Sequence, residues 1–382
     1  MISYGKHDIN QNDIHEVIKC LQSDFLTQGN RINIFENKIS TYCNCKFAAG
    51  VNSGTSALVI GCMAIGLVKN DILWTSPISF VSSANCGLFL GAKIDFVDIN
   101  EFTFNIDTEK LELKLKKAKK QQKLPKAIVV VHMAGLSCDM KEIYKLSKKY
   151  KFKIIEDASH GLGGSYYNHK IGSCKFSDIT VLSFHPVKTI TTAEGGMCLT
   201  NNFTYYKKIL KLRNNGVQKN LENKPRWFYS VDSLGLNFRM NDIQASLGIS
   251  QAGRIDSFIK KRKIIANRYN KILQDLPIKL PNNFSNYSSS WHLYIVRLKE
   301  KKHINNKKKI FDYLYSNKII TQVHYIPIHT HNLYKKFGFK KNDFPEAINY
   351  YDEAISLPIY PKLKYQEQLK VCKVLKKCLK II

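Results

Sequence analysis

The feature that most constrains the fold is an alternation of apolar strand-like runs and helix-like segments. Residues 127–132 form a continuous apolar run rich in β-branched side chains, which is typical of a strand buried on both faces. A helical apolar period follows at 139–151, and a second strand-like run follows at 152–155. This rhythm predicts an α/β fold in which a mostly parallel sheet is covered by helices on both faces.

Other segments extend the pattern and divide the chain. Short strands are predicted at 47–51, 72–74, 93–97 and 180–184, and an apolar helix begins at Ser56. The chain of 382 residues is longer than one core normally serves, so two domains are expected. A helical pattern runs from Met240 to about residue 276. Beyond Pro277 we expect strands at 291–298 and 319–325 and helices at 307–316, 345–355 and 365–379. We therefore predict a large α/β domain over residues 1–252 and a smaller α+β domain over residues 253–382.

Several classes of protein are disfavoured by the composition. The longest apolar run, Ala57 to Val68, has twelve residues and is too short to span a bilayer. The first residues lack the apolar core of an export signal. Ten scattered cysteines include no Cys-x-x-Cys pair, so we expect reduced thiols, no metal site and a cytoplasmic location.

The net charge of +29 needs an explanation. A basic balance is compatible with nucleic acid, with an anionic membrane, or with a lysine-rich coding bias. The lysines are spread along the chain, and no arginine-rich arm or zinc-finger spacing occurs, which makes nucleic acid an unfavoured partner. A positive field would also attract a polyanionic small substrate such as a nucleoside diphosphate.

Lys188 differs from most other lysines in its surroundings. It lies between the predicted strand at 180–184 and the Gly195-Gly196 turn, whereas most lysines lie in hydrophilic runs. A partly desolvated lysine amine can lose its proton and hold a carbonyl cofactor as an imine. The alternative is an ordinary surface lysine, but three further segments favour the first interpretation.

The first segment is a strand, turn and helix start at 52–58, where Gly54, Thr55 and Ser56 could bind a phosphate or simply cap the helix. The second places Asp157 at the end of a buried strand, where ligands of open α/β sheets bind. Asp157 is either a helix cap or the partner of a pyridine nitrogen. His160 could reach the hydroxyl of such a ring or serve a structural role. The third is a polar loop at 234–241 that enters a helix.

Together these segments resemble the DegT/StrS-type nucleotide-sugar aminotransferases, which are pyridoxal-phosphate (PLP) enzymes of fold type I. The resemblance covers nearly the whole chain. It rests on ordered motifs at 26–29, 35–36, 52–57, 79–85, 96–98, 132–135, 156–160 and 183–188. It implies that Lys188 holds PLP and shuttles the proton, and that Asp157 pairs with the pyridinium. It further implies that Phe80 stacks on the ring, and that Ser183 and residues 54–56 hold the phosphate. Asn237 is expected to reach the phosphate of the neighbouring subunit's cofactor, which requires a homodimer.

The resemblance also suggests the substrate. A dehydratase branch of the family has His where this chain has Lys188, so a transaminase is favoured. The stretches at 23–29, 323–329 and 356–361 are similar to members that move an amine from L-glutamate to C4 of a UDP-linked 4-keto-6-deoxy-N-acetylhexosamine, as in a pseudaminic-acid-type pathway. Another 4-keto or 3-keto nucleotide sugar, for example dTDP-linked or gluco-configured, is the alternative. A basic nucleic-acid-binding or regulatory protein on an inactive aminotransferase fold is the non-enzymatic alternative. The residues expected to contact the substrate are Thr27, Gln28, His324, Tyr325, His329 and, from the partner chain, Arg239. Leu236 departs from the family pattern, in which an aromatic residue usually precedes the asparagine.

Overall fold

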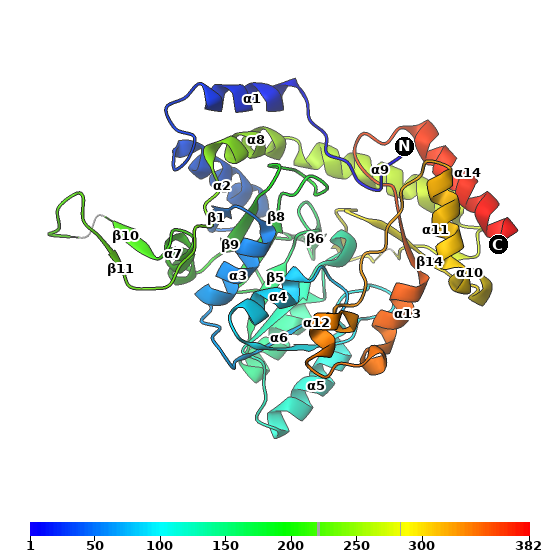
Figure 1. The fold of residues 1–382 in the computed structure, drawn as a ribbon, viewed down its shortest axis with the longest axis horizontal. Coiled ribbons are helices and arrows are strands. Elements are labelled where there is room, and N and C mark those ends of the chain that lie inside the picture. The colour runs from blue at the N-terminus through cyan, green and yellow to red at the C-terminus, as the bar shows by residue number, and fades with distance from the viewer. Residues whose placement is uncertain (220–221, 283) are drawn as a thin grey trace.

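The computed structural model describes residues 1–219, 222–282 and 284–382. Its centre is a seven-stranded sheet in the order β1-β9-β8-β5-β4-β2-β3 (Figure 1). The strands are β1 (Phe47–Val51), β2 (Ile72–Thr75), β3 (Lys93–Phe96), β4 (Ala127–Val131), β5 (Lys153–Asp157), β8 (Ile179–Ser183) and β9 (Gly196–Thr200). β3, β2, β4, β5 and β8 are parallel, and β9 runs antiparallel to both β8 and β1.

The register of the parallel strands positions the functional residues. Asp157 at the end of β5 lies beside Val131 of β4 and Val181 of β8. The carboxyl ends of these three strands therefore meet at one edge of the sheet, and the loops that follow them converge there.

Both faces of the sheet are covered, as the continuous apolar strands require. Val129 and Ile155 pack with α3 in one core cluster, while Ile128 and Ile154 pack with α5 and α6 in another. The helices of this region are α1 (Gln11–Leu21), α2 (Asn30–Cys43), α3 (Gly54–Ala64), α4 (Ser82–Phe89), α5 (Thr108–Lys120), α6 (Met140–Tyr150) and α7 (Phe203–Leu212). The predicted α/β class is confirmed.

A separate apolar cluster forms in the C-terminal part of the chain. It joins the long helix α9 (Ile255–Leu273), the strands β14 (Tyr294–Leu298) and β15 (Ala354–Leu357), and the helices α11 (Lys307–Ser316) and α14 (Tyr365–Ile381). The N-terminal residue Ile2 belongs to the same cluster. The division of the chain at residue 253 stays a prediction. The other elements here are α8 (Asp242–Ala252), β12 (Ile278–Lys279), α10 (Lys301–Asn305), α12 (Asn332–Lys335) and α13 (Pro345–Glu353).

Four predicted segments differ in the structure. Residues 319–325 do not form a strand of the small sheet, which consists of β12, β14 and β15. Only Ile319 and Gln322 make single bridges, to Ile2 and Ser356. The helix predicted at 345–355 ends at Glu353, since the pairing of β15 with β14 overrides the local helical pattern. The strand predicted at 291–298 begins only at Tyr294, and the helical stretch after Met240 is two helices that meet near Gly253.

Short two-residue and three-residue strands complete the structure. β6 (Ser165–Tyr166) pairs with β7 (His169–Lys170) and with β13 (Tyr287–Ser288). β10 (Val217–Lys219) and β11 (Tyr229–Val231) form an arm that projects away from the sheet beside α7 (Figure 1).

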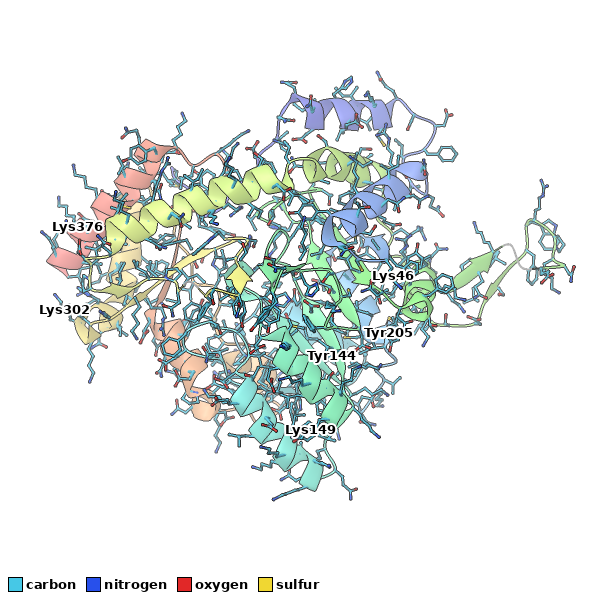
Figure 2. The ribbon with its side chains drawn as sticks, turned by 180° about the vertical axis from the view of Figure 1, so that it is seen from behind. Lys46, Tyr144, Lys149, Tyr205, Lys302 and Lys376 are labelled. Carbon is cyan, nitrogen blue, oxygen red and sulfur yellow. The ribbon has the colours of Figure 1, made fainter. Side chains whose placement is uncertain are left out.

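Lysines occur on several separate elements of the structure. The lysines labelled in Figure 2 lie at four separated places, next to β1 (Lys46) and on α6 (Lys149), α10 (Lys302) and α14 (Lys376). Among the described residues, no helix is both long enough and apolar enough to cross a membrane.

Candidate active site

A cavity of about 440 Å³ lies at the carboxyl ends of β4, β5 and β8. Loops from the start of α3 and from the C-terminal part of the chain close it. Most of the predicted site residues line it: Gly54, Thr55, Phe80, Asp157, His160, Ser183, Lys188, His324 and Tyr325. The structure thus collects residues that are separated by up to 271 positions in the sequence.

Lys188 is held in the loop that follows β8. Its backbone N–H donates to the carbonyl of His185 at 2.9 Å, which closes a turn. No hydrogen bond or ion pair engages its amine within residues 1–219, 222–282 and 284–382. Burial lowers the pKa of Lys188 to about 8, and the Asp157 carboxylate opposes this shift. About a tenth of the amine is therefore neutral at pH 7, and the neutral amine is the form that attacks a carbonyl carbon.

The carboxyl group of Asp157 accepts three hydrogen bonds. The Ser83 hydroxyl of α4 donates to Oδ2 at 2.6 Å, while the hydroxyl and N–H of Ser159 donate to Oδ1 at 2.6 and 3.1 Å. Behind it, the buried Glu156 pairs with His132 Nε2 at 2.7 Å. The three hydrogen bonds fix the orientation of the Asp157 carboxyl group at the edge of the sheet.

The start of α3 offers free donors close to Ser183. Ser53 caps the helix through its side chain, and no acceptor for the N–H groups of Gly54 and Thr55 occurs in the described part of the chain. A Cβ at Gly54 would lie 2.9 Å from the Cβ of Ser183, so only glycine allows this close approach. Two N–H groups, the Ser183 hydroxyl and the helix dipole together suit a phosphate.

Ser56, the third residue predicted for the phosphate turn, is placed differently from Gly54 and Thr55. Its hydroxyl donates to Asn52 Oδ1 at 2.6 Å, and its N–H donates to Ser53 Oγ at 3.0 Å. Ser56 does not line the cavity, because the helix cap already uses its polar groups.

One wall of the cavity consists of imidazole and phenol rings. His160 Nε2 lies 3.0 Å from the Tyr325 hydroxyl, and His324 Nδ1 lies 2.9 Å from Ser356 Oγ. Burial lowers the pKa of His160 well below its ordinary value, and the charge of Lys188 contributes. Burial also lowers the pKa of His324 to about 4. These rings are neutral at physiological pH. Phe80, by contrast, is 57% exposed at the mouth of the cavity.

Besides Ser56, five predicted residues lie outside the cavity of their own chain. Thr27 and Gln28 are exposed in the loop before α2. Asn237 and Arg239 follow the projecting arm, where Arg239 donates to Asn214 Oδ1 at 2.6 Å. His329 is fully buried, with its Nε2 3.0 Å from the carbonyl of Lys341. The structure therefore gives His329 a structural place, because its ring is enclosed by Phe96 and Phe344.

Other lining residues were not predicted. They include Tyr4 from the N-terminal segment and His292 from the residues before β14. Neither has a local sequence signal, since single aromatic residues in apolar stretches are usually part of the core. Ser83 belongs to the motif at 79–85, but the motif alone does not predict its hydrogen bond to Asp157.

Comparison with known proteins identifies the family. The model of the DegT/DnrJ/EryC1/StrS aminotransferase family matches residues 7–376. The chain belongs to this family.

Named relatives extend over the whole chain. The UDP-4-amino-4,6-dideoxy-N-acetyl-beta-L-altrosamine transaminase of Campylobacter jejuni is 37% identical over 368 residues, which cover 96% of this chain and 94% of that protein. The solved structure of Helicobacter pylori PseC, an aminotransferase involved in the biosynthesis of pseudoaminic acid, is 33% identical. It has a TM-score of 0.92 and both chains are covered completely. The PLP form of a sugar aminotransferase from Streptococcus pneumoniae is 28% identical, with a TM-score of 0.91, and covers 100% of this chain and 99% of its own.

These findings confirm the predicted fold and class. The chain is an aminotransferase with the architecture of PLP-dependent sugar aminotransferases. The non-enzymatic alternative of an inactive, nucleic-acid-binding relative is set aside, because the family is enzymatic and the Lys188–Asp157 pair is intact.

Proposed function

We propose that this enzyme uses PLP to move an amine from L-glutamate to C4 of a UDP-linked 4-keto-6-deoxy-N-acetylhexosamine. The observation that carries the proposal is that Lys188 and the oriented Asp157 carboxyl group line one cavity, and that the Lys188 amine has no partner among the described residues. The 37% identical Campylobacter transaminase supports the choice of sugar and of C4.

The residues of the cavity fit PLP. A reactive amine, a carboxylate and a phosphate-binding helix start are the three groups that PLP requires, and here they are Lys188, Asp157 and the Gly54–Thr55 turn with Ser183. The buried Nδ1 of His160 has no partner among the described residues, so one polar atom of the wall is available to a ligand. The close approach of Gly54 to Ser183 forms the cradle for a phosphate.

When bound, PLP supplies an electron sink for the carbanion that forms during amine transfer. Lys188 Nζ would hold its carbonyl carbon and then move a proton between the reacting carbon atoms. The Asp157 carboxylate would hold a proton on the pyridine nitrogen. The Gly54 and Thr55 N–H groups and Ser183 would bind the phosphate, and Phe80 would cover one face of the ring.

The substrate assignment extends to the residues at the mouth. Tyr325 and His324 line the cavity of this chain and are proposed to contact the sugar. Arg239 and Asn237 lie outside that cavity, so we propose that they act in the neighbouring subunit of a homodimer. Thr27 and Gln28 are exposed and are proposed to join the site from the N-terminal loop. The ten free thiols fit the proposed cytoplasmic location.

A substrate panel tests this function. The enzyme is first converted to its amine form with L-glutamate, and UDP-, dTDP- and GDP-linked keto sugars are then offered one at a time. Return of the original absorbance should be fastest with the UDP-linked 4-keto-6-deoxy-N-acetylhexosamine. Preference for a dTDP-linked or 3-keto sugar would refute the substrate and leave the aminotransferase class intact.

A further inference from the structure

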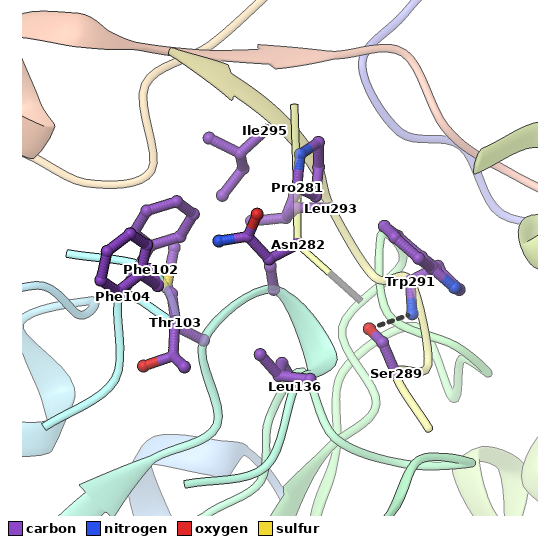
Figure 3. A pocket seen from close by; sticks show the side chains of 12 residues that line it. Phe102, Thr103, Phe104, Leu136, Pro281, Asn282, Ser289, Trp291, Leu293 and Ile295 are labelled. Carbon is purple, nitrogen blue, oxygen red and sulfur yellow. Dashed lines mark hydrogen bonds between the residues drawn. The ribbon is translucent and has the colours of Figure 1, made fainter. Parts of the chain in front are cut away.

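An unusual backbone turn precedes β14 at the edge of the cavity. Trp291 has φ +52°, a left-handed conformation that is rare for a bulky residue. Its N–H donates to Ser289 Oγ at 3.0 Å, the bond drawn dashed in Figure 3, which shows a second pocket that Trp291 lines and that does not contain Lys188. Such strain persists only where the surroundings hold it in place, and it clusters at functional sites.

Arg262 of α9 holds this turn. Its side chain is 1% exposed, and Nη1 donates to the carbonyls of Trp291 at 3.2 Å, His292 at 3.1 Å and Ile359 at 3.0 Å. No carboxylate pairs with it in the described part of the chain. Burying an unpaired guanidinium is costly, and burial lowers the pKa of Arg262 to about 10. Since the buried guanidinium of Arg262 donates only to backbone carbonyls, we interpret it as a group that holds these carbonyls in place.

The turn presents His292 to the cavity. His292 is 4% exposed, lines the same cavity as Lys188, and its buried Nδ1 has no partner among the described residues. Its ring centroid lies 4.3 Å from that of His160, with 32° between the ring planes. His292 therefore covers one face of the His160 ring.

His160 needs such support because its two ring nitrogens have different roles. Nε2 has the Tyr325 hydroxyl as its hydrogen-bond partner at 3.0 Å, whereas the buried Nδ1 has no partner among the described residues. A neutral imidazole has one donor nitrogen and one acceptor nitrogen, so the two positions are not interchangeable. Rotation of the ring about its Cβ–Cγ bond would move both the donor and the acceptor.

We infer that Arg262 and His292 are positioning residues, which fix the orientation of the His160 ring and thereby the hydrogen bond that His160 offers to the cofactor. This inference rests on the proposed function, because it needs PLP in the cavity. The charged and titratable groups around the two imidazoles are Lys188, His324, Tyr325 and Arg262.

The test compares four variants as purified holoenzymes: His292→Ala, His292→Phe, Arg262→Met and, as the matched control, His303→Ala. His303 is a buried histidine of α10 that does not line the cavity and contacts the carbonyl of Leu379 at 2.9 Å. Absorbance is titrated against pH to give the pKa of the bound chromophore, cofactor dissociation is measured by dilution, and thermal unfolding of the apoprotein reports stability.

His292→Ala should shift the pKa of the chromophore by half a unit or more and speed cofactor release about tenfold. His292→Phe should restore most of both properties because it keeps a ring against His160. Arg262→Met should behave like His292→Ala, provided that its apoprotein still unfolds cooperatively. His303→Ala should lower only the melting temperature.

An unchanged chromophore in a folded His292→Ala enzyme would overturn the inference, as would a His292→Phe enzyme that matches the alanine variant. A wild-type protein that binds no PLP would instead refute the proposed function, so the two failures are distinguishable.

Discussion

Two lysines in different regions of the molecule have similarly lowered pKa values but differ in the groups that surround their amines. Burial lowers the pKa of Lys188, in the loop after β8, and of Lys307, at the start of α11, to about 8 in each case. The ammonium of Lys307 donates to the backbone carbonyl of Tyr351. It also lies 4.9 Å from the centroid of the Tyr351 ring. The amine of Lys188 has no such partner in the described residues and lies in a cavity with Asp157 and the α3 phosphate cradle. A lowered lysine pKa therefore marks burial, and the groups that converge on the amine decide whether it is a reactive centre.

The largest expected difference between the two lysines is in turnover. Lys188→Ala should reduce kcat on the order of 10⁴-fold or more, because both the covalent attachment and the proton transfer depend on its amine. Lys307→Ala should leave kcat within about twofold of wild type and lower only stability. Steady-state transamination with L-glutamate measures both. Similar losses in the two variants would break the comparison.

A smaller but still large effect is expected from the carboxylate beside Lys188. Asp157→Asn should keep PLP bound and slow the transamination half-reaction about 10²–10³-fold, because a neutral amide cannot stabilise a charged pyridinium. Stopped-flow absorbance with L-glutamate gives the rate. Asp352→Asn, which removes the carboxylate near Lys307, is the matched control and should change the rate little. A near-normal rate in Asp157→Asn would refute the role of this carboxylate.

Mixing subunits tests whether Asn237, which lies outside the cavity of its own chain, completes the site of a neighbouring subunit. Lys188→Ala and Asn237→Ala subunits are each expected to be nearly inactive alone. After exchange, half of the dimers are mixed and each has one complete site, so about a quarter of wild-type activity should return. Mass spectrometry under native conditions confirms the exchange. No recovery after confirmed exchange would show that each site is built from one chain.

The smallest expected effect is on stability. The pKa of Lys188 is lower in the folded protein than in the unfolded chain, so between pH 8 and 10.5 the unfolded chain binds the extra proton. This contribution makes the folded state more stable as the pH rises through that window. Lys188→Met apoprotein should therefore be more stable than wild type by about 1–2 kcal/mol at pH 7, with the difference fading by pH 10.5. Urea unfolding at the two pH values measures it, and a difference that grows with pH would contradict the assignment.

The sequence predicted those parts of the molecule that depend on local pattern. The central strands and their helices have strong periodicity in the sequence, and the loops after β5 and β8 begin with characteristic residues. The sequence therefore predicts Asp157 and Lys188 as site residues, and both line the cavity. The small C-terminal sheet was predicted less well. The pairing of β15 with β14 is a tertiary contact that the helical pattern before Ala354 conceals.

The site residues follow the same distinction. His324 and Tyr325 line the cavity as expected, whereas His329, five positions from His324 in the same motif, is enclosed by aromatic rings and lies outside it. Tyr4 and His292 could not be found from the sequence, since their place in the cavity depends on long-range contacts. The N-terminal segment reaches the site through backbone hydrogen bonds of Ile2 and Tyr4 with Ile320 and Ile359, and Arg262 fixes the turn before β14.

One measurement tests the assignment of Lys188 most directly. The holoenzyme is reduced with borohydride, digested, and searched by mass spectrometry for the lysine that carries the pyridoxyl group. The label should lie on Lys188 in near-stoichiometric amount and should disappear after preincubation with L-glutamate. A label on Lys307, a label spread over several surface lysines, or no label on a protein that remains folded would contradict Lys188 as the cofactor lysine.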